Sequence, residues 1–292
     1  MAGKHAYLII AHNNFYTLSL LLKMLDDERN DLYLHIDART ADAPFERLRE
    51  CVSRSRLEFV KRIAVKWGHS SQVDCELILL EAAMKNQPYD FVHLISGADL
   101  PIKSKEYIFN FFDNHKNTQF LQVGYASKHL QRVSKYNFSI GIKNKSLKRA
   151  AENVAEILNN KIGADRLKKY GDMKIVKTSN WFSVTGDCAE YILKKKRFIK
   201  RFTRFTCCAD EMFLGTVIWN SPFLSQVYDP KPSWDGHMRY IDRIRNVGSS
   251  PHTFTIKDRQ SIDESEMLFA RKFDENVDRD IIDYVYNKCC TR

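Results

Sequence analysis

The alternation of short apolar runs with helical patterns in the first 125 residues limits the fold more than any other feature. Apolar runs of strand length occupy residues 6–11, 31–37, 89–95 and 119–123. Apolar residues recur at helical spacing over residues 15–25, 43–51, 70–83 and 105–112. Strands and helices that alternate at this interval favour right-handed crossovers and a largely parallel sheet, so the sequence predicts an α/β fold.

Polar residues follow several predicted strands, and they indicate where a ligand binds. His12 follows the first strand, Asp37 ends the second, and the loop at 96–99 follows a third. Ligands of parallel sheets bind beyond the carboxyl ends of the strands, so we expect these residues at one site. The chain has neither a G-x-G-x-x-G nor a G-x-x-x-x-G-K-[ST] loop, which argues against glycine-rich dinucleotide sites and P-loops.

Charge and cysteine usage limit the partner and the compartment. The net charge of +10 predicts an anionic partner, which is a nucleotide, a nucleic acid or a membrane surface. The seven cysteines include two vicinal pairs and no C-x-x-C spacing, which favours a reducing cytosol over a disulfide framework or a zinc site. The first apolar run is too short for a signal peptide, and no run reaches the roughly 18 residues that cross a bilayer. We therefore predict a cytoplasmic protein.

Two basic segments interrupt the α/β pattern. Residues 194–204 (KKKRFIKRFTR) form either a solvated helix face or a site for anionic lipid, which would place the protein at the inner face of a membrane. Nucleic acid is disfavoured as a partner, because no nucleic-acid-binding module is visible. Residues 128–177 are basic and polar with a helical stretch at 147–158, and we interpret them as an insertion over the sheet.

The stretch CCADEMFLGTVI at 207–218 places two adjacent carboxylates at the start of an apolar helical pattern. Asp210 is expected to cap this helix by accepting hydrogen bonds from its free backbone N–H groups. Glu211 points elsewhere, one residue round the turn. In a dry cleft its pKa would rise and it would serve as a general base. The alternative is a capped core helix with a solvated Glu211.

Aromatic residues near the predicted site allow two interpretations. Trp234, His237 and Tyr240 lie in a segment rich in proline and glycine, where they line an acceptor groove or fill the core. Trp181, in a predicted strand at 180–184, packs against the sugar site or in the core. Aromatic faces stack on sugars, but they also supply much of the buried area of a protein interior.

Seven segments, in order, resemble the core-2/I-branching β-1,6-N-acetylglucosaminyltransferase family, which also contains the peptide O-xylosyltransferases and many bacterial proteins. They are AYLIIAHN (6–13), LYLHIDAR (32–39), VKWGHSSQVDCELILL (65–80), YDFVHLISGADLPIKS (89–104), SNWFSVT (179–185), ADEMFLGTVIWNSP (209–222) and LFARKFD (268–274). The resemblance covers nearly the whole chain. Each motif is weak alone, and their order makes the match specific.

The resemblance implies a GT-A fold in one domain over residues 1–292, with a Rossmann-like nucleotide-sugar-binding half at 1–125 and an acceptor-binding, catalytic half at 126–292. It implies inversion at the anomeric carbon, a UDP-sugar donor carrying N-acetylglucosamine or xylose, and a glycan or lipid-linked saccharide acceptor. Members of the family work without a divalent metal, so we expect no metal ligands and no cofactor. The one Asp-x-Asp, at 278–280, falls in a predicted C-terminal helix. We expect a bacterial enzyme of surface-polysaccharide synthesis.

Several residues acquire roles from the family motifs. Glu211 falls on the catalytic base, Asp37 on the acidic residue near the nucleotide, Ile10 and His12 on the strand end against the uracil, and Lys272 on the lysine that neutralises the diphosphate. In this scheme Asp210 orients the helix of the base. Asp99 orients the donor sugar or braces its loop.

The chain also departs from the family pattern. It lacks the disulfide cysteines of the animal enzymes, and the Trp-x-Tyr of the acceptor site appears as Tyr240-Ile241-Asp242. No clean counterpart of the second diphosphate cation is visible, and Arg245, His252 and Arg259 are the candidates. Two alternatives stay open: a metal-dependent GT-A transferase, and a non-enzymatic basic module that binds lipid or nucleic acid.

Overall fold

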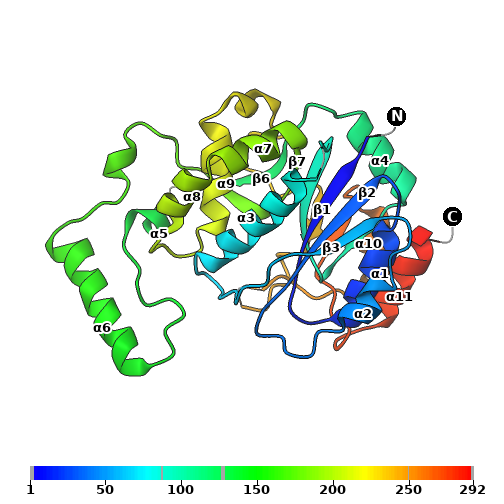
Figure 1. The fold of residues 1–292 in the computed structure, drawn as a ribbon, viewed down its shortest axis with the longest axis horizontal. Helices are drawn as coiled ribbons and strands as arrows, with labels where there is room; N and C mark the ends of the chain where they lie inside the picture. Colours follow the sequence, from blue (N-terminus) through cyan, green and yellow to red (C-terminus); the bar gives the residue numbers. More distant parts are fainter. Residues whose placement is uncertain (1–2, 87, 126–128, 249, 291–292) are drawn as a thin grey trace.

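A six-stranded sheet forms the centre of the computed structural model, which describes residues 3–86, 88–125, 129–248 and 250–290. The strand order is β3-β2-β1-β4-β7-β6 (Figure 1). The strands are β1 (His5–Ala11), β2 (Asn30–Ile36), β3 (Arg56–Phe59), β4 (Phe91–Ser96), β6 (Phe120–Gly124) and β7 (Lys177–Thr185). Strands β1 to β4 pair in parallel, whereas β7 runs antiparallel to both β4 and β6. The predicted α/β fold with a Rossmann-like, mostly parallel central sheet is confirmed.

Helices cover both faces of this sheet and divide the interior into two cores. The helices are α1 (Phe15–Leu25), α2 (Phe45–Arg49), α3 (Ser71–Met84), α4 (Lys105–Asp113), α5 (Gln131–Ser134), α6 (Lys145–Glu156), α7 (Gly186–Lys194), α8 (Lys196–Thr203), α9 (Asp210–Trp219), α10 (Arg259–Glu264) and α11 (Asp280–Cys290). Side chains alternate along β1, so Tyr7 and Ile9 join the core under α1 and α11, while Ala6 and Leu8 join the core under α3 and α9. Burial on both faces explains the continuous apolar sequence of this strand.

A second, three-stranded sheet, ordered β5-β9-β8, closes one end of the central sheet. Its strands are β5 (Asp99–Pro101), β8 (Arg239–Ile241) and β9 (Phe269–Arg271). The sequence predicts a loop over 96–101, which is wrong for its last three residues. They pair antiparallel with β9, placing Asp99 opposite Arg271. Strand β5 leaves no recognisable strand pattern in the sequence, because it is only three residues long and its partner β9 lies far along the chain.

The prediction that the segment 128–177 lies over the sheet is wrong for its middle part only. Near its ends Val133 is buried in the core under α3 and α9, and Leu167 and Tyr170 pack against that core. Helix α6, predicted at 147–158, stands away from the body instead (Figure 1). The first residue of the segment, Lys128, and the predicted division at 126 lie outside the described residues. Within the described part of the chain, no helix is long and apolar enough to cross a membrane.

Candidate active site

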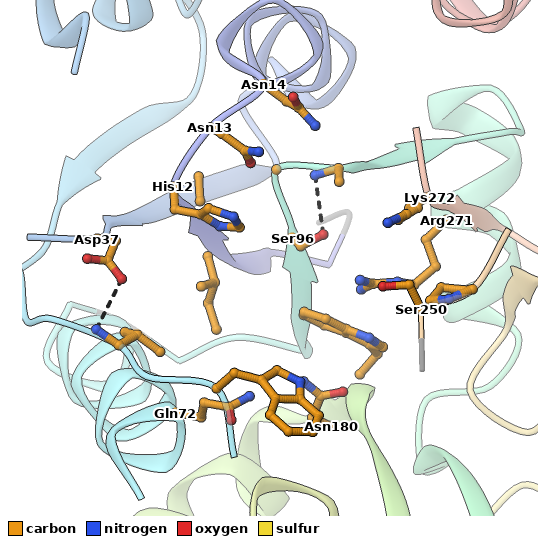
Figure 2. A pocket seen from close by; sticks show the side chains of 18 of the residues that line it. His12, Asn13, Asn14, Asp37, Gln72, Ser96, Asn180, Ser250, Arg271 and Lys272 are labelled. Atoms are coloured by element: carbon orange, nitrogen blue, oxygen red, sulfur yellow. Dashed lines mark hydrogen bonds between the residues drawn. The ribbon is translucent and has the colours of Figure 1, made fainter. Parts of the chain in front are cut away.

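A cleft of about 570 Å³ opens at the carboxyl ends of β1, β2 and β4. Strand β1 pairs with β2 on one side and β4 on the other, which is a topological switch point where open α/β sheets bind ligands. The start of α9 and the end of β9 also contribute to its walls. Figure 2 shows Asp37 on one side of the cleft and Lys272 on the other. The cleft therefore joins segments from the whole length of the chain.

The first strand end supplies Ile10 and His12, both of which line the cleft. The N–H of Gly97 donates to the carbonyl oxygen of Ile10 at 2.9 Å, which joins β1 to the loop after β4. A Cβ on Gly97 would lie only 3.0 Å from the Cβ of Ala11. The two segments approach so closely because glycine has no side chain at this point.

The N-terminus of α1 points toward the cleft region, but a carboxylate of the protein occupies it. Oε2 of Glu275 accepts hydrogen bonds from the backbone N–H of Thr17 at 2.8 Å and from its hydroxyl at 3.2 Å. A helix N-terminus attracts anions through its free N–H groups and its dipole. Glu275 therefore places a negative charge at this helix end, which disfavours a second anion there.

Asp37 lies directly after β2 and lines the cleft. Arg39 donates to its two carboxylate oxygens at 2.9 and 2.8 Å, and the N–H of Val65 donates at 3.0 Å. Burial opposes ionisation, but these hydrogen bonds outweigh it and lower the pKa of Asp37 to about 2. The carboxylate is therefore fixed and charged, and it holds the basic residue Arg39.

The end of β9 supplies the two cations on the opposite wall, Arg271 and Lys272. The guanidinium of Arg271 lies 4.1 Å from the centre of the Trp181 ring, a cation–π geometry. Its Nη1 lies 3.3 Å from Oδ1 of Asp99, whose side chain is fully buried. Asp99 also accepts hydrogen bonds from the backbone N–H and hydroxyl of Ser96. Asp99 therefore braces both its loop and Arg271, and it does not line the cleft.

Glu211 lies in the first turn of α9 and lines the cleft. It forms ion pairs with Arg132 of α5 and with Lys177, whose Nζ lies 3.5 Å from Oε2. Its side chain is 29% exposed. The condition of a dry cleft is therefore not met at Glu211, because two cations and solvent surround its carboxylate. The ion pairs fix the direction of the carboxylate.

The buried carboxylate of the pair is Asp210. The N-cap of α9 is Ala209, and no side chain caps this helix, so the predicted capping role of Asp210 is wrong. Gln72 donates to its Oδ2 at 3.1 Å, and its Oδ1 has no partner among the described residues. Burial, followed by the charge of Glu211, raises the pKa of Asp210 to about 7. Burial and the nearby Asp210 likewise raise the pKa of Glu76, which also lines the cleft.

The four aromatic predictions have different outcomes. Trp181 lines the cleft, with one ring face against Arg271. Trp234 and Tyr240 lie outside the residues found to line it. Tyr240 stacks on Phe254, with ring centres 5.3 Å apart, so it fills the core. Trp234 is 63% exposed, and its ring lies 5.1 Å from the guanidinium of Arg243, which does line the cleft. Predicted acceptor-groove residue His237 is buried.

The three predicted candidates for a second diphosphate cation lie outside the lining of the cleft. Arg245, His252 and Arg259 are absent from the cleft lining among the described residues. Arg245 and His252 instead bind Asp258 at 2.7 and 3.0 Å. Arg271 and Arg243 hold positions on the cleft wall. No group of three or more His, Cys, Asp or Glu side chains in the described ranges could hold a metal ion.

A protein-family model described as Core-2/I-Branching enzyme matches residues 5–267. The chain belongs to this family. The family assignment that the motifs predict is thereby confirmed.

Individual relatives of this Core-2/I-Branching enzyme are distant. Xylosyltransferase 2 of Canis lupus familiaris is 22% identical over 299 residues, covering 95% of this chain and 33% of the dog protein. Xylosyltransferase 1 of Homo sapiens is 23% identical over 302 residues, covering 95% and 29%. The chain thus spans about a third of the length of the curated relatives it matches. The structure of mouse Xyloside xylosyltransferase 1 in its apo form aligns over 91% of this chain and 96% of that chain, with 11% identity and a TM-score of 0.38.

Sequence reasoning missed several residues around the cleft of this Core-2/I-Branching enzyme. Arg271 stands beside Lys272 in LFARKFD, and its position in that motif was the available signal. Arg132 and Lys177 left no signal, because they approach Glu211 from 79 and 34 positions earlier in the chain. In the sequence Glu76 is a polar residue within an apolar helical pattern and gives no signal of a site. It lies near Asp210 only in the folded chain.

Proposed function

We propose that the chain is an inverting, metal-independent glycosyltransferase that moves a sugar from a UDP-sugar to a glycan hydroxyl. The observation that carries this proposal is that Glu211 and Lys272 line the same cleft although they come from α9 and from the end of β9. A base and a leaving-group cation in one cavity are the two parts that an in-line displacement requires.

Glu211 is the general base in this scheme. The acceptor hydroxyl oxygen forms a bond to the anomeric carbon while its proton passes to the Glu211 carboxylate. The bond between that carbon and the diphosphate oxygen breaks in the same step, and its electron pair leaves with UDP. Arg132 and Lys177 hold the carboxylate in place, which supplies the orientation that such a step needs.

The leaving UDP gains negative charge, and fixed cations stabilise it in place of a metal ion. Lys272 and Arg271 are the first choices, because both line the wall opposite Asp37. Their positions are set by the protein in advance, since Arg271 packs between Trp181 and Asp99. Ile10, His12 and Asp37 are the proposed contacts of the nucleotide.

The finer parts of the proposal concern substrates and setting. The donor sugar is N-acetylglucosamine or xylose, and the names of the xylosyltransferase relatives support xylose. The acceptor is a glycan or a lipid-linked saccharide of a bacterial surface polysaccharide. Peripheral contact of residues 194–204 with an anionic membrane fits such an acceptor. On α8 the exposed cations Arg197 and Arg201 support it electrostatically.

Titration with UDP, UDP-xylose and UDP-N-acetylglucosamine, followed by a hydrolysis assay with and without EDTA, tests the proposal. We expect UDP to raise the unfolding temperature and one UDP-sugar to be hydrolysed equally well in EDTA. Hydrolysis that disappears with EDTA and returns with Mn²⁺ would contradict metal independence alone. A chain that neither binds UDP nor hydrolyses any UDP-sugar would contradict the transferase proposal as a whole.

A further inference from the structure

Helix α6 carries an apolar stripe on an arm, residues 137–165, that stands away from the body (Figure 1). None of its 12 residues, all of which are described, is buried. Leu147, Ala151 and Val154 follow the spacing i, i+4 and i+7, so they share one face of α6. Leu147 is 62% exposed and Val154 is 50% exposed. Packing of an apolar face stabilises most helices in proteins, so this face is expected to meet a partner.

The charge of the arm indicates what kind of partner fits. Over residues 137–165 the arm carries five cationic side chains, Lys143, Lys145, Lys148, Arg149 and Lys161, and three carboxylates, Glu152, Glu156 and Asp165. The arm is therefore net positive, and Lys148 pairs with Glu152 within it. A helix that is polar over most of its surface, with apolar residues on one face and Lys or Arg on the other, is typical of helices that lie in a membrane interface.

Helix α8 reinforces this charge at the base of the arm. Arg166 donates to the carbonyl oxygens of Val133 and Phe202 at 2.8 and 3.1 Å, and the N–H of Asn137 donates to the carbonyl oxygen of Phe205 at 2.7 Å. These bonds fasten both ends of the arm to the C-terminal end of α8. Exposed cations of α8 therefore keep a fixed position relative to the arm.

The phenylalanines of α8 are not available to enter a membrane. Phe202 is buried, and Phe198 packs against Phe202 and Tyr170. Helix α8 thus offers charge without an apolar surface, whereas α6 offers an apolar surface flanked by charge. Exposed Phe205, at 41%, and Trp67, at 75%, add aromatic side chains of the kind that sit at membrane interfaces.

We propose that α6 is a membrane-docking helix whose Leu147–Val154 face enters the headgroup region of an anionic lipid surface, while the cations of the arm and of α8 face the lipid phosphates. A second copy of the chain fits less well. It would bring an equally basic arm against this one, and like charges repel at an interface. A polyanionic lipid surface complements both the charge and the stripe.

The arm begins beside the candidate active site. Arg132, in α5 at its base, forms an ion pair with Glu211. Lys66, next to the cleft residue Trp67, donates to the carbonyl oxygen of Gly141 in the arm at 3.0 Å. A membrane under α6 would thus lie near the side of the cleft that holds Glu211. A lipid-linked acceptor would then reach the base directly; this last step alone rests on the proposed function.

Sedimentation of the full chain with vesicles tests the docking without any sugar transfer. The vesicles are phosphatidylcholine alone, or phosphatidylcholine mixed with phosphatidylglycerol. The test variant is Leu147→Gln/Val154→Gln, since glutamine keeps helix propensity. The matched control is Ile244→Gln/Val277→Gln, which removes two exposed apolar side chains, 98% and 58% exposed, outside the arm. Hydrogen exchange of the amides of 145–156 is followed with and without vesicles.

We expect the protein to bind only the anionic vesicles, with an affinity that falls as salt is added. The test variant should bind at least about tenfold more weakly, the control should bind like the original chain, and the α6 amides should be protected only on anionic vesicles. Equal binding of both variants without α6 protection would overturn the proposal. So would absence of vesicle binding, or a dimer in solution that the test variant abolishes.

Discussion

Nζ of Lys177 lies 3.5 Å from Oε2 of Glu211, and the same carboxylate pairs with Arg132. The two cations come from β7 and α5, so two separate elements aim one carboxylate into the cleft. A base whose direction is fixed before the acceptor arrives needs little rearrangement in the reaction. This arrangement makes predictions about the base and about its supports.

Glu211→Gln should reduce transfer by about 10²–10⁴-fold, because a positioned base contributes about that much to the rate. The binding constant for UDP, measured by calorimetry, should not change, since the proposed diphosphate cations Arg271 and Lys272 lie at the end of β9 and directly after it. Glu190→Gln serves as the control, because that exposed residue pairs with Lys194 away from the cleft. Turnover of Glu211→Gln at the original rate would end the assignment of the base.

Lys177→Met should lower kcat by about tenfold and leave the KM for the donor unchanged, because it loosens the base and touches no donor contact. Lys177→Arg should recover most of the rate, since arginine restores the charge beside Glu211. Steady-state kinetics with varied donor and acceptor separates these parameters. Equal losses in both variants, with a lowered unfolding temperature, would instead indicate a structural role.

Lys272→Met should lower kcat by about 10²–10³-fold and weaken the binding of UDP, since it removes a charge that stabilises the leaving group. Arg271→Met should act in the same direction and also release Trp181 and Asp99 from their contacts. The exposed residue Lys231 provides the control variant Lys231→Met. Full activity of Lys272→Met would remove this residue from the diphosphate site.

Asp210→Asn should change how stability depends on pH. Burial raises the pKa of Asp210 from 3.8 to about 7 in the folded protein. Between about pH 4 and 7 the folded state therefore binds more protons than the unfolded state, and the free energy of unfolding falls as pH rises. The variant removes this term, so its stability should fall less over that range and exceed that of the original chain at pH 8.

Urea unfolding at several pH values measures this effect. The difference at pH 8 should amount to a few kcal/mol at most, since each pKa unit corresponds to about 1.4 kcal/mol. Asp113→Asn, at an exposed position at the end of α4, is the control and should follow the original curve. A variant curve parallel to the original between pH 4 and 7 would show that Asp210 ionises normally in the folded state.

The parts of the fold that depend on local periodicity could be predicted. Helix α1 has the predicted bounds, and β1, β2 and β4 lie within a residue or two of the predicted runs. Each of these elements buries one or both faces, so its apolar residues follow a regular spacing in the sequence. Strand β5 could not be found, since its three residues are stabilised by β9 and not by their neighbours. The exposed position of α6 could not be predicted either, because an amphipathic pattern does not indicate what the apolar face packs against.

In the candidate site, too, some residues could be predicted from the sequence and others could not. Strand ends placed His12 and Asp37 at one edge, since parallel strands bring their carboxyl ends together, and the family motif added Ile10. The surroundings of Glu211 could not be predicted, because Arg132 and Lys177 reach it only through the folded chain. Adjacent Asp210 and Glu211 look equivalent in the sequence, yet one is buried and the other paired with cations.

The pairing of β9 with β5 has a consequence for engineering this enzyme. Arg271 and Lys272 come from the last tenth of the chain, and Arg271 is joined to β5 through Asp99. A chimaera that exchanges the C-terminal segment would therefore also replace the charges that we propose to stabilise the departing UDP. On this proposal, grafts should keep β5 and β9 from the same parent.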